Sequence, residues 1–214
     1  MIDSAFNETR CIRVPRSREA NQAIREERRA ELLAVAARVF SRQGYVGTRI
    51  SDIADAAGIS KGLLYHYFPG KEQVFIELVE LASRGSLHLL RTALGMPASA
   101  GERLRWLIQQ EMDGLGEDPH IFMVVLQAVM SDAVPAQARR IAEELVTESQ
   151  ALMLDLVVAG QTAGEIVAGD PRDIATLLGT GLSGLAVGAA LGPLAWSLPK
   201  ADGFTRFFLK SGHL

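Results

Sequence analysis

The feature that most restricts the fold of this chain is a tight turn between two short apolar segments. Residues 49–57 carry apolar side chains at helical spacing, and residues 61–68 form a second short segment of this kind. Gly58 allows a sharp turn between them, Ile59 is expected to fill the corner, and Ser60 can cap the second helix. Two short helices joined in this way predict a helix-turn-helix motif.

Helix start signals, apolar stripes and breakers alternate along the rest of the chain. Thr48 is expected to be the N-cap of the first motif helix, and serine, aspartate or proline opens most later segments. The sequence has no convincing alternating pattern of the kind that predicts a β-strand. It therefore predicts an all-α protein, with helices over residues 24–43, 49–57, 61–68, 71–94, 99–115, 118–130, 135–163 and 171–192.

Charge is divided unequally along the chain, although the net charge is only −3. Residues 1–70 contain 11 Lys and Arg against 8 Asp and Glu, a net charge of +3, whereas residues 71–214 contain 11 against 17, a net charge of −6. A basic N-terminal third suits contact with a polyanion. The single cysteine, Cys11, excludes an intramolecular disulfide and a cysteine-built metal site.

The N-terminal residues 1–25 are expected to form a basic arm without regular structure. Arg10, Arg13, Arg16 and Arg18 lie there, and Pro15 discourages a continuous helix. A disordered tail and an arm that follows the DNA backbone are both compatible with this composition. No apolar run of signal-peptide length occurs in the first thirty residues, which predicts a cytoplasmic protein.

One uncharged segment of 26 residues, 174–199, is long enough to cross a bilayer of ~30 Å. On a helical projection its glycines lie on one face, and the opposite face carries small and hydroxyl side chains that lipid rewards weakly. Pro193 interrupts the segment, and the chain has no other spanning candidate. A buried helix in close contact with other helices is therefore favoured over a membrane span.

Three segments in fixed order carry a resemblance to a known family. They are GYVGT at 44–48, DIADAAGISKG at 52–62 and LYHYFPGKE at 64–72, and together they closely resemble the DNA-binding domain of the tetracycline-repressor (TetR) family. The resemblance covers about residues 26–86, with the motif itself at 49–68. It implies that residues 87–214 form the helical domain that binds an effector and dimerises.

The resemblance also implies which residues meet double-stranded DNA, with the second motif helix in the major groove. These residues are Thr48, Arg49, Ser60, Lys61, Gly62, Leu63, Tyr65, His66, Tyr67 and Lys71. Arg49 stands where the family often has a second threonine, and it adds a cation that can meet a phosphate or a base. Leu63 stands where a small or hydroxyl residue is usual; a leucine can touch a thymine methyl but cannot hydrogen-bond a base edge.

In residues 87–214 the resemblance implies an effector pocket and a homodimer. Side chains that would suit a small apolar effector are His88, Trp106, Gln109, Met112, Phe122, Met123, Gln127 and Met130. Each of these is also compatible with ordinary core or surface packing. The residues expected at the dimer interface are Leu145, Leu152, Leu156, Leu177, Gly181, Gly184, Leu185, Gly188 and Gly192.

The resulting prediction is a homodimeric regulator, most simply a repressor, that binds a palindromic operator and is released by a small molecule. No enzyme activity, cofactor or metal site is expected. The histidines are scattered, and the fingerprint-like run from Gly179 to Gly184 lies inside a helix instead of after a strand. One alternative stays open: a small-molecule-binding or membrane-associated helical protein without specific DNA readout.

Overall fold

The computed structural model describes residues 18–192 and 198–210. Within these residues the regular elements are all helices, and a single isolated antiparallel bridge pairs Ile166 with Leu209. The prediction of an all-α protein is confirmed. The helices are α1 (Arg18–Gly47), α2 (Ile50–Ala56), α3 (Lys61–Tyr67), α4 (Lys71–Gly95), α5 (Ala100–Glu117), α6 (His120–Met130), α7 (Ala136–Thr162), α8 (Pro171–Leu191) and α9 (Ala201–Thr205).

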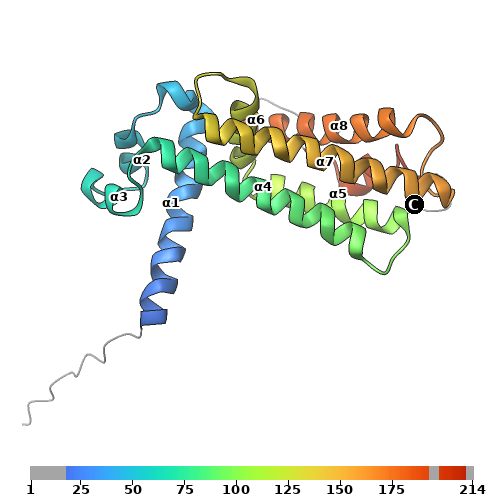
Figure 1. Cartoon of the computed structure of the whole chain (residues 1–214), viewed down its shortest axis with the longest axis horizontal. Helices are drawn as coiled ribbons and strands as arrows, with labels where there is room; N and C mark the ends of the chain where they lie inside the picture. Colours follow the sequence, from blue (N-terminus) through green and yellow to red (C-terminus); the bar gives the residue numbers. More distant parts are fainter. Residues whose placement is uncertain (1–17, 193–197, 211–214) are drawn as a thin grey trace, which may run out of the picture.

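The helices form a small head at one end of a long body (Figure 1). We call α1, α2, α3 and the first two turns of α4 the head, and the remaining helices the body. Helix α4 runs from the head into the body, where it packs along α7 (Figure 1). The N-terminal end of α1 extends away from the body and from the other helices of the head (Figure 1), and residues 22–27 there are exposed. The motif helices α2 and α3 thus lie at the far end of the molecule.

Buried side chains form two clusters, and the first of them joins the head to the body. It contains Phe40, Leu64 and Phe75 of the head together with Val124 of α6 and Leu145 of α7. The second cluster lies deeper in the body, where the C-terminal half of α4 packs with α5, α7 and α8. The position of the head is therefore set by helices that belong to the body.

Polar contacts reinforce the packing of α6 on α1. Gln127 donates from Nε2 to the main-chain oxygen of Phe40 at 2.9 Å, and the Ser41 hydroxyl lies 2.7 Å from Nδ1 of His120. Near the start of α6, Arg38 forms an ion pair with Asp118 at 3.7 Å. These contacts bind the C-terminal half of α1 to α6 along its length.

Some helix boundaries near the motif differ from the prediction. Helix α1 begins at Arg18 instead of near residue 24, so the end of the expected arm is helical; residues 1–17 lie outside the described part. The N-cap of α2 is Arg49, not Thr48. The cap moves by one residue because the carboxylate of Asp52 accepts a hydrogen bond from the main-chain N–H of Arg49 at 2.8 Å.

Two further differences lie in the body. Helix α6 begins at His120, after Pro119, whereas proline was expected as its first residue. Asp118 nevertheless supplies the capping contact, accepting a hydrogen bond from the His120 N–H at 3.0 Å. The short helix α9 was not predicted, because its five residues are too few to show a helical period.

The glycine-rich helix α8 begins as predicted, with Asp170 accepting a hydrogen bond from the Arg172 N–H at 2.8 Å. By length and composition α8 could cross a membrane, but only 17% of its apolar stretch is buried. The expectation of a buried helix is therefore not met within one chain. The helix ends at Leu191, and Pro193 lies outside the described residues.

Candidate nucleic-acid interface

The turn between α2 and α3 has the geometry that its sequence predicts. Gly58 adopts φ +65°, in the left-handed region that favours glycine. Ile59 packs against the first buried cluster, and the Ser60 side chain accepts a hydrogen bond from the Leu63 N–H at 3.1 Å. The turn and the N-terminus of α3 are therefore fixed by local contacts.

Helix α3 buries one side of itself and leaves the rest open. Leu64 within the helix and Phe68 directly after it are fully buried. Leu63 and Tyr65 are 43% and 45% exposed. Four further residues that are expected to contact DNA are also exposed, namely Ser60, Lys61, Gly62 and His66. Tyr67 is half-buried. The open side of α3 thus presents aromatic and basic side chains together.

The charge of this surface is positive. Helix α3 contains Lys61 and no acidic residue, and the Lys61 ammonium lies 5.7 Å from the centre of the Tyr65 ring. Arg49 at the start of α2 is exposed. Cations beside aromatic rings on a protruding helix can meet phosphates and base edges without first breaking ion pairs of their own.

Thr48 has a structural role that the sequence did not reveal. Its side chain is fully buried, and its hydroxyl donates a hydrogen bond to the Gly44 main-chain oxygen at 2.7 Å. Gly44 itself adopts φ +71° and breaks α1. The Thr48 hydroxyl is therefore used inside the head and is not free to contact DNA in this conformation.

Lys71 likewise holds the head together. Its ammonium donates hydrogen bonds to the main-chain oxygens of Tyr45 and Thr48, both at 2.8 Å, and lies 4.5 Å from the centre of the Tyr45 ring. Burial, and secondarily the charge of Glu72, raises the pKa of the Tyr45 hydroxyl above its ordinary value. Lys71 thus ties the start of α4 to the end of α1, and the phosphate contact that the resemblance implies stays a prediction.

The residues expected at an effector site are spread over the body. Met112 is buried, Trp106, Phe122, Met123 and Gln127 are half-buried, and Met130 is 76% exposed. A surface groove of about 400 Å³ lies between α4 and α7, and His88 is the one predicted effector residue in its lining. The structure does not bring the predicted set together around this groove.

Glu111 on α5 is a carboxylate that the sequence did not single out. Burial raises its pKa above the ordinary value, because a charged carboxylate is poorly solvated inside the body.

In the described residues, His, Cys, Asp and Glu do not form a group of three or more that could hold a metal ion.

The residues expected at the dimer interface fall into three groups. Leu145 and Leu156 are buried in the clusters of their own chain, and their contact with a second copy stays a prediction. Leu177 is 60% exposed, and a Cβ atom added at Gly184 or Gly188 would meet nothing within 4 Å. In the third group, Leu152 and Leu185 are half-buried. Gly181 lies beside Phe204, and Gly192 is the C-cap of α8.

Comparisons with known proteins agree with the geometry of the head. The family described as "Bacterial regulatory proteins, tetR family" matches residues 32–78. The transcriptional repressor KstR2 of Rhodococcus jostii is 31% identical over 141 residues, which cover 64% of this chain and 67% of KstR2. The chain belongs to the TetR family. The relatives that it matches are named as transcriptional regulators, not as enzymes.

Other relatives match over a smaller share of their length. The transcriptional activator FasR of Mycolicibacterium smegmatis is 29% identical over 135 residues, 62% of this chain and 61% of FasR. KstR2 of Mycobacterium tuberculosis is 38% identical over 104 residues, 47% of this chain and 50% of that repressor. The TetR-family chain thus spans between half and two thirds of the length of these curated relatives.

Solved structures show the same fold over nearly the whole chain. The structure of KstR2 from Mycobacterium tuberculosis superposes with a TM-score of 0.69 at 21% identity, and covers 86% of this chain and 96% of that one. PfmR from Thermus thermophilus gives a TM-score of 0.67 at 24% identity, over 82% and 93% of the two chains. The body of the TetR-family regulator therefore shares its architecture with these proteins.

Proposed function

We propose that this TetR-family regulator binds a palindromic operator in double-stranded DNA as a homodimer, acts as a repressor in the cytoplasm, and is released by a small molecule. The observation that carries the proposal is α3, a protruding helix whose open side combines Lys61, Tyr65 and His66. A helix of this size fits the major groove, where base edges differ from one another.

The DNA contacts divide by chemistry. Lys61, Gly62, Leu63, Tyr65 and His66 would face base edges. Residues beside them would meet phosphates, namely the exposed Arg49 and Ser60 and the half-buried Tyr67. Thr48 and Lys71 would act from inside the head, because their polar groups bind main-chain oxygens of residues 44–48.

A homodimer would provide the second motif that a palindrome requires. Its proposed interface is the outer face of α7 and α8, where Val146, Val158, Leu177 and Leu191 are between 38% and 60% exposed. Contact with a second copy would cover these apolar side chains. The open space at Gly184 and Gly188 would let two α8 helices approach closely.

Repression and release are inferred from relatives and from the shape of the chain. KstR2 is named a repressor, while FasR is named an activator, so both signs occur among relatives. SmeT, a structural neighbour with a TM-score of 0.64, was solved with triclosan. Methionines and aromatics in the body, including Met112 and Met123, suit a small apolar effector of this general kind.

Release requires that the effector and DNA favour different arrangements of the body and head. Helix α4 belongs to both parts and is the element through which they would be coupled. Coupling of this type is worth about 1–3 kcal/mol and is reciprocal, so operator DNA should weaken effector binding by the same factor. Calorimetry of a candidate effector with and without operator measures that factor, and equal affinities would exclude release by this route.

The decisive experiment is selection of duplexes from a random pool by the purified protein, followed by binding at several salt concentrations. A DNA-reading dimer should enrich a near-palindromic site and bind it with a steep negative dependence of affinity on the logarithm of salt concentration. A small-molecule-binding or membrane-associated protein without DNA readout would enrich no sequence. That result would reject the proposed function.

A further inference from the structure

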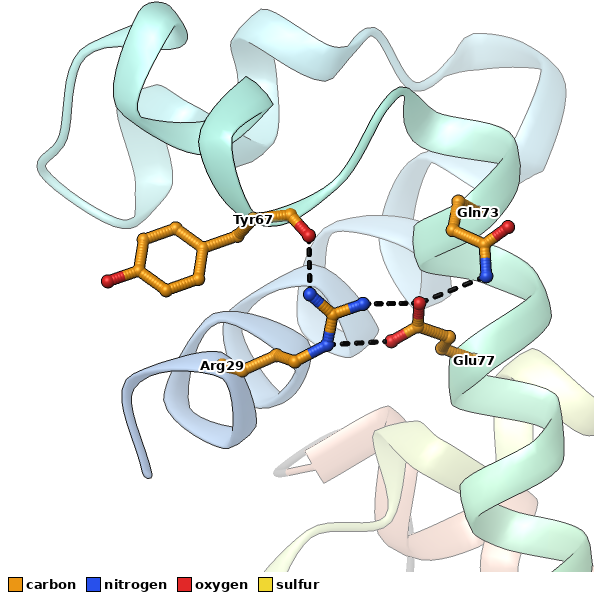
Figure 2. Close-up of polar contacts among 4 residues, drawn as sticks. All are labelled: Arg29, Tyr67, Gln73 and Glu77. Atoms are coloured by element: carbon orange, nitrogen blue, oxygen red, sulfur yellow. Dashed lines mark hydrogen bonds and ion pairs between the residues drawn. The ribbon is translucent and has the colours of Figure 1, made fainter. Parts of the chain in front are cut away.

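The C-terminal end of α3 is held by a side chain from outside the motif. Arg29 of α1 donates hydrogen bonds to the main-chain oxygen of Tyr67, the last residue of α3, and to both carboxylate oxygens of Glu77 on α4 (Figure 2). Its Nε lies 3.0 Å from Oε2 of Glu77. Gln73 donates from Nε2 to Oε1 of the same carboxylate, also at 3.0 Å. One guanidinium thus joins three helices.

The chemistry of this contact suits arginine. A planar guanidinium can bind a carboxylate with two N–H groups while a third reaches another acceptor, whereas a lysine ammonium acts as a single point charge. The Arg29 guanidinium also lies 4.2 Å from the centre of the Phe68 ring. The side chains of Arg29 and Glu77 are only 31% and 17% exposed, so solvent screens this pair less than a fully exposed one.

Helix α3 needs such a contact because it has little packing of its own. Leu64 is the single buried residue in its seven, and one buried side chain does not stop a short helix from tilting. Ser60 fixes the N-terminal end. The last carbonyls of any helix lack intrahelical partners, and Arg29 provides one for Tyr67.

We propose that Arg29 is a positioning residue for DNA recognition, which sets the direction of α3 relative to α4 without contacting DNA itself. The inference rests on the proposed DNA-binding function. Since Glu77 lies on α4, a displacement of α4 reaches the C-terminal end of α3 through the same guanidinium.

The test compares the wild-type protein with Arg29→Ala, Arg29→Lys, Glu77→Gln and the control Arg28→Ala. Arg28 is a matched control because it adjoins Arg29, carries the same charge, is 42% exposed and pairs with Glu31 of the same helix. Affinity is measured for the duplex that the wild-type protein selects and for a scrambled duplex of equal length and composition. Each measurement is repeated over a series of NaCl concentrations, well below the thermal unfolding midpoint of every variant.

Relative to Arg28→Ala, we expect Arg29→Ala to bind the selected duplex about tenfold more weakly and the scrambled duplex within about twofold. The salt dependence should be the same for both variants, since neither arginine would neutralise a phosphate. Glu77→Gln should lose part of the sequence preference. Arg29→Lys should recover part of it, because lysine can bind the carboxylate or the carbonyl but cannot reproduce the fork.

Two outcomes would overturn the proposal. Equal losses on both duplexes, with a salt slope lowered by about one, would make Arg29 a phosphate contact. An unchanged preference for the selected duplex in folded Arg29→Ala would remove any positioning role. If Arg29→Ala does not fold, unchanged preference in both Arg29→Lys and Glu77→Gln would decide against the proposal. A wild-type protein that selects no duplex contradicts the DNA-binding function instead, so the two failures are distinguishable.

Discussion

Helices α3 and α8 both leave much of their surface uncovered in the single chain, but they expose opposite chemistry. The open side of α3 carries Lys61, Tyr65 and His66, whereas the open side of α8 carries Leu177, glycines and threonines. Basic and polar aromatic side chains interact favourably with a hydrated polyanion such as DNA. Apolar and small side chains are stabilised when another protein surface removes them from water. Exposure alone therefore says little about a helix, and its composition indicates the kind of partner.

The largest expected effect tests the protein-facing side of this comparison. In the proposed homodimer, Gly188→Leu should separate the subunits, because overpacking costs about 1–3 kcal/mol at each site and a two-fold interface contains the site twice. The single chain should fold normally, since nothing lies within 4 Å of a Cβ atom built at Gly188. Light scattering at micromolar concentration should show half the wild-type mass.

A control variant separates this effect from a general cost of adding leucine. Gly85 on α4 has equally open surroundings, so Gly85→Leu should leave the mass unchanged. A dimer that persists in Gly188→Leu would place the subunit contact elsewhere than α8.

The next effect tests the DNA-facing side. Arg49→Ala should weaken binding to all duplexes by about 1 kcal/mol and lower the salt slope by about one unit, because it removes an exposed cation that the proposal places at a phosphate. Lys71→Ala serves as the comparison, since that ammonium is bound to the Tyr45 and Thr48 main-chain oxygens. Lys71→Ala should lower the thermal unfolding midpoint and leave the salt dependence of DNA affinity unchanged. A reduced slope in Lys71→Ala alone would reverse these assignments.

A smaller and more specific effect is expected at Leu63, whose side chain is 43% exposed. Leu63→Ala should relax the preference for thymine at one position of each half-site by roughly 1 kcal/mol, since an apolar contact to a methyl group is lost. Repeating the duplex selection with the variant measures this change. An identical selected sequence would show that Leu63 does not face the groove.

The smallest effect concerns a group that belongs to neither surface. Burial raises the pKa of Glu111 above its ordinary 4.5, so the folded protein holds a proton there at pH values where the unfolded chain has released it. This group therefore lowers stability as the pH rises from 4.5 through the raised pKa. Glu111→Gln should unfold at higher urea concentration than the wild type at pH 8, with a smaller difference at pH 5.

The exposed Glu117 at the end of α5 provides the control for that measurement. Glu117→Gln should change the urea midpoint little at either pH. Glu111→Gln should leave DNA affinity and dimer mass as in the wild type, and a change in either would connect α5 to one of the two surfaces.

Local chemistry explains which parts of the head could be predicted from the sequence. Gly58 and Ser60 determine the turn and the cap of α3 by themselves, so the motif could be predicted from the sequence. The N-cap of α2 was displaced because Asp52, three residues further on, binds the Arg49 N–H. Contacts between distant segments, such as those of Arg29, leave no periodic signal in the sequence.

The body was predictable in outline only. Periodicity along α7 correctly indicates an apolar face, but it does not say which surface that face meets. Leu145 and Leu156 therefore looked like interface residues and are buried within their own chain. For the effector residues the sequence supplied only composition, and composition does not specify which side chains share a cavity.

The first buried cluster crosses the boundary between the two domains that the sequence suggests. Phe40, Leu64 and Phe75 share it with Val124 and Leu145, which lie far beyond residue 86. Parts of a protein that pack against one another unfold together, even when they lie far apart along the chain. A fragment ending at residue 86 would expose the apolar surface that α6 and α7 cover, so it should not fold autonomously. In scanning calorimetry the head and α6 should melt in one transition.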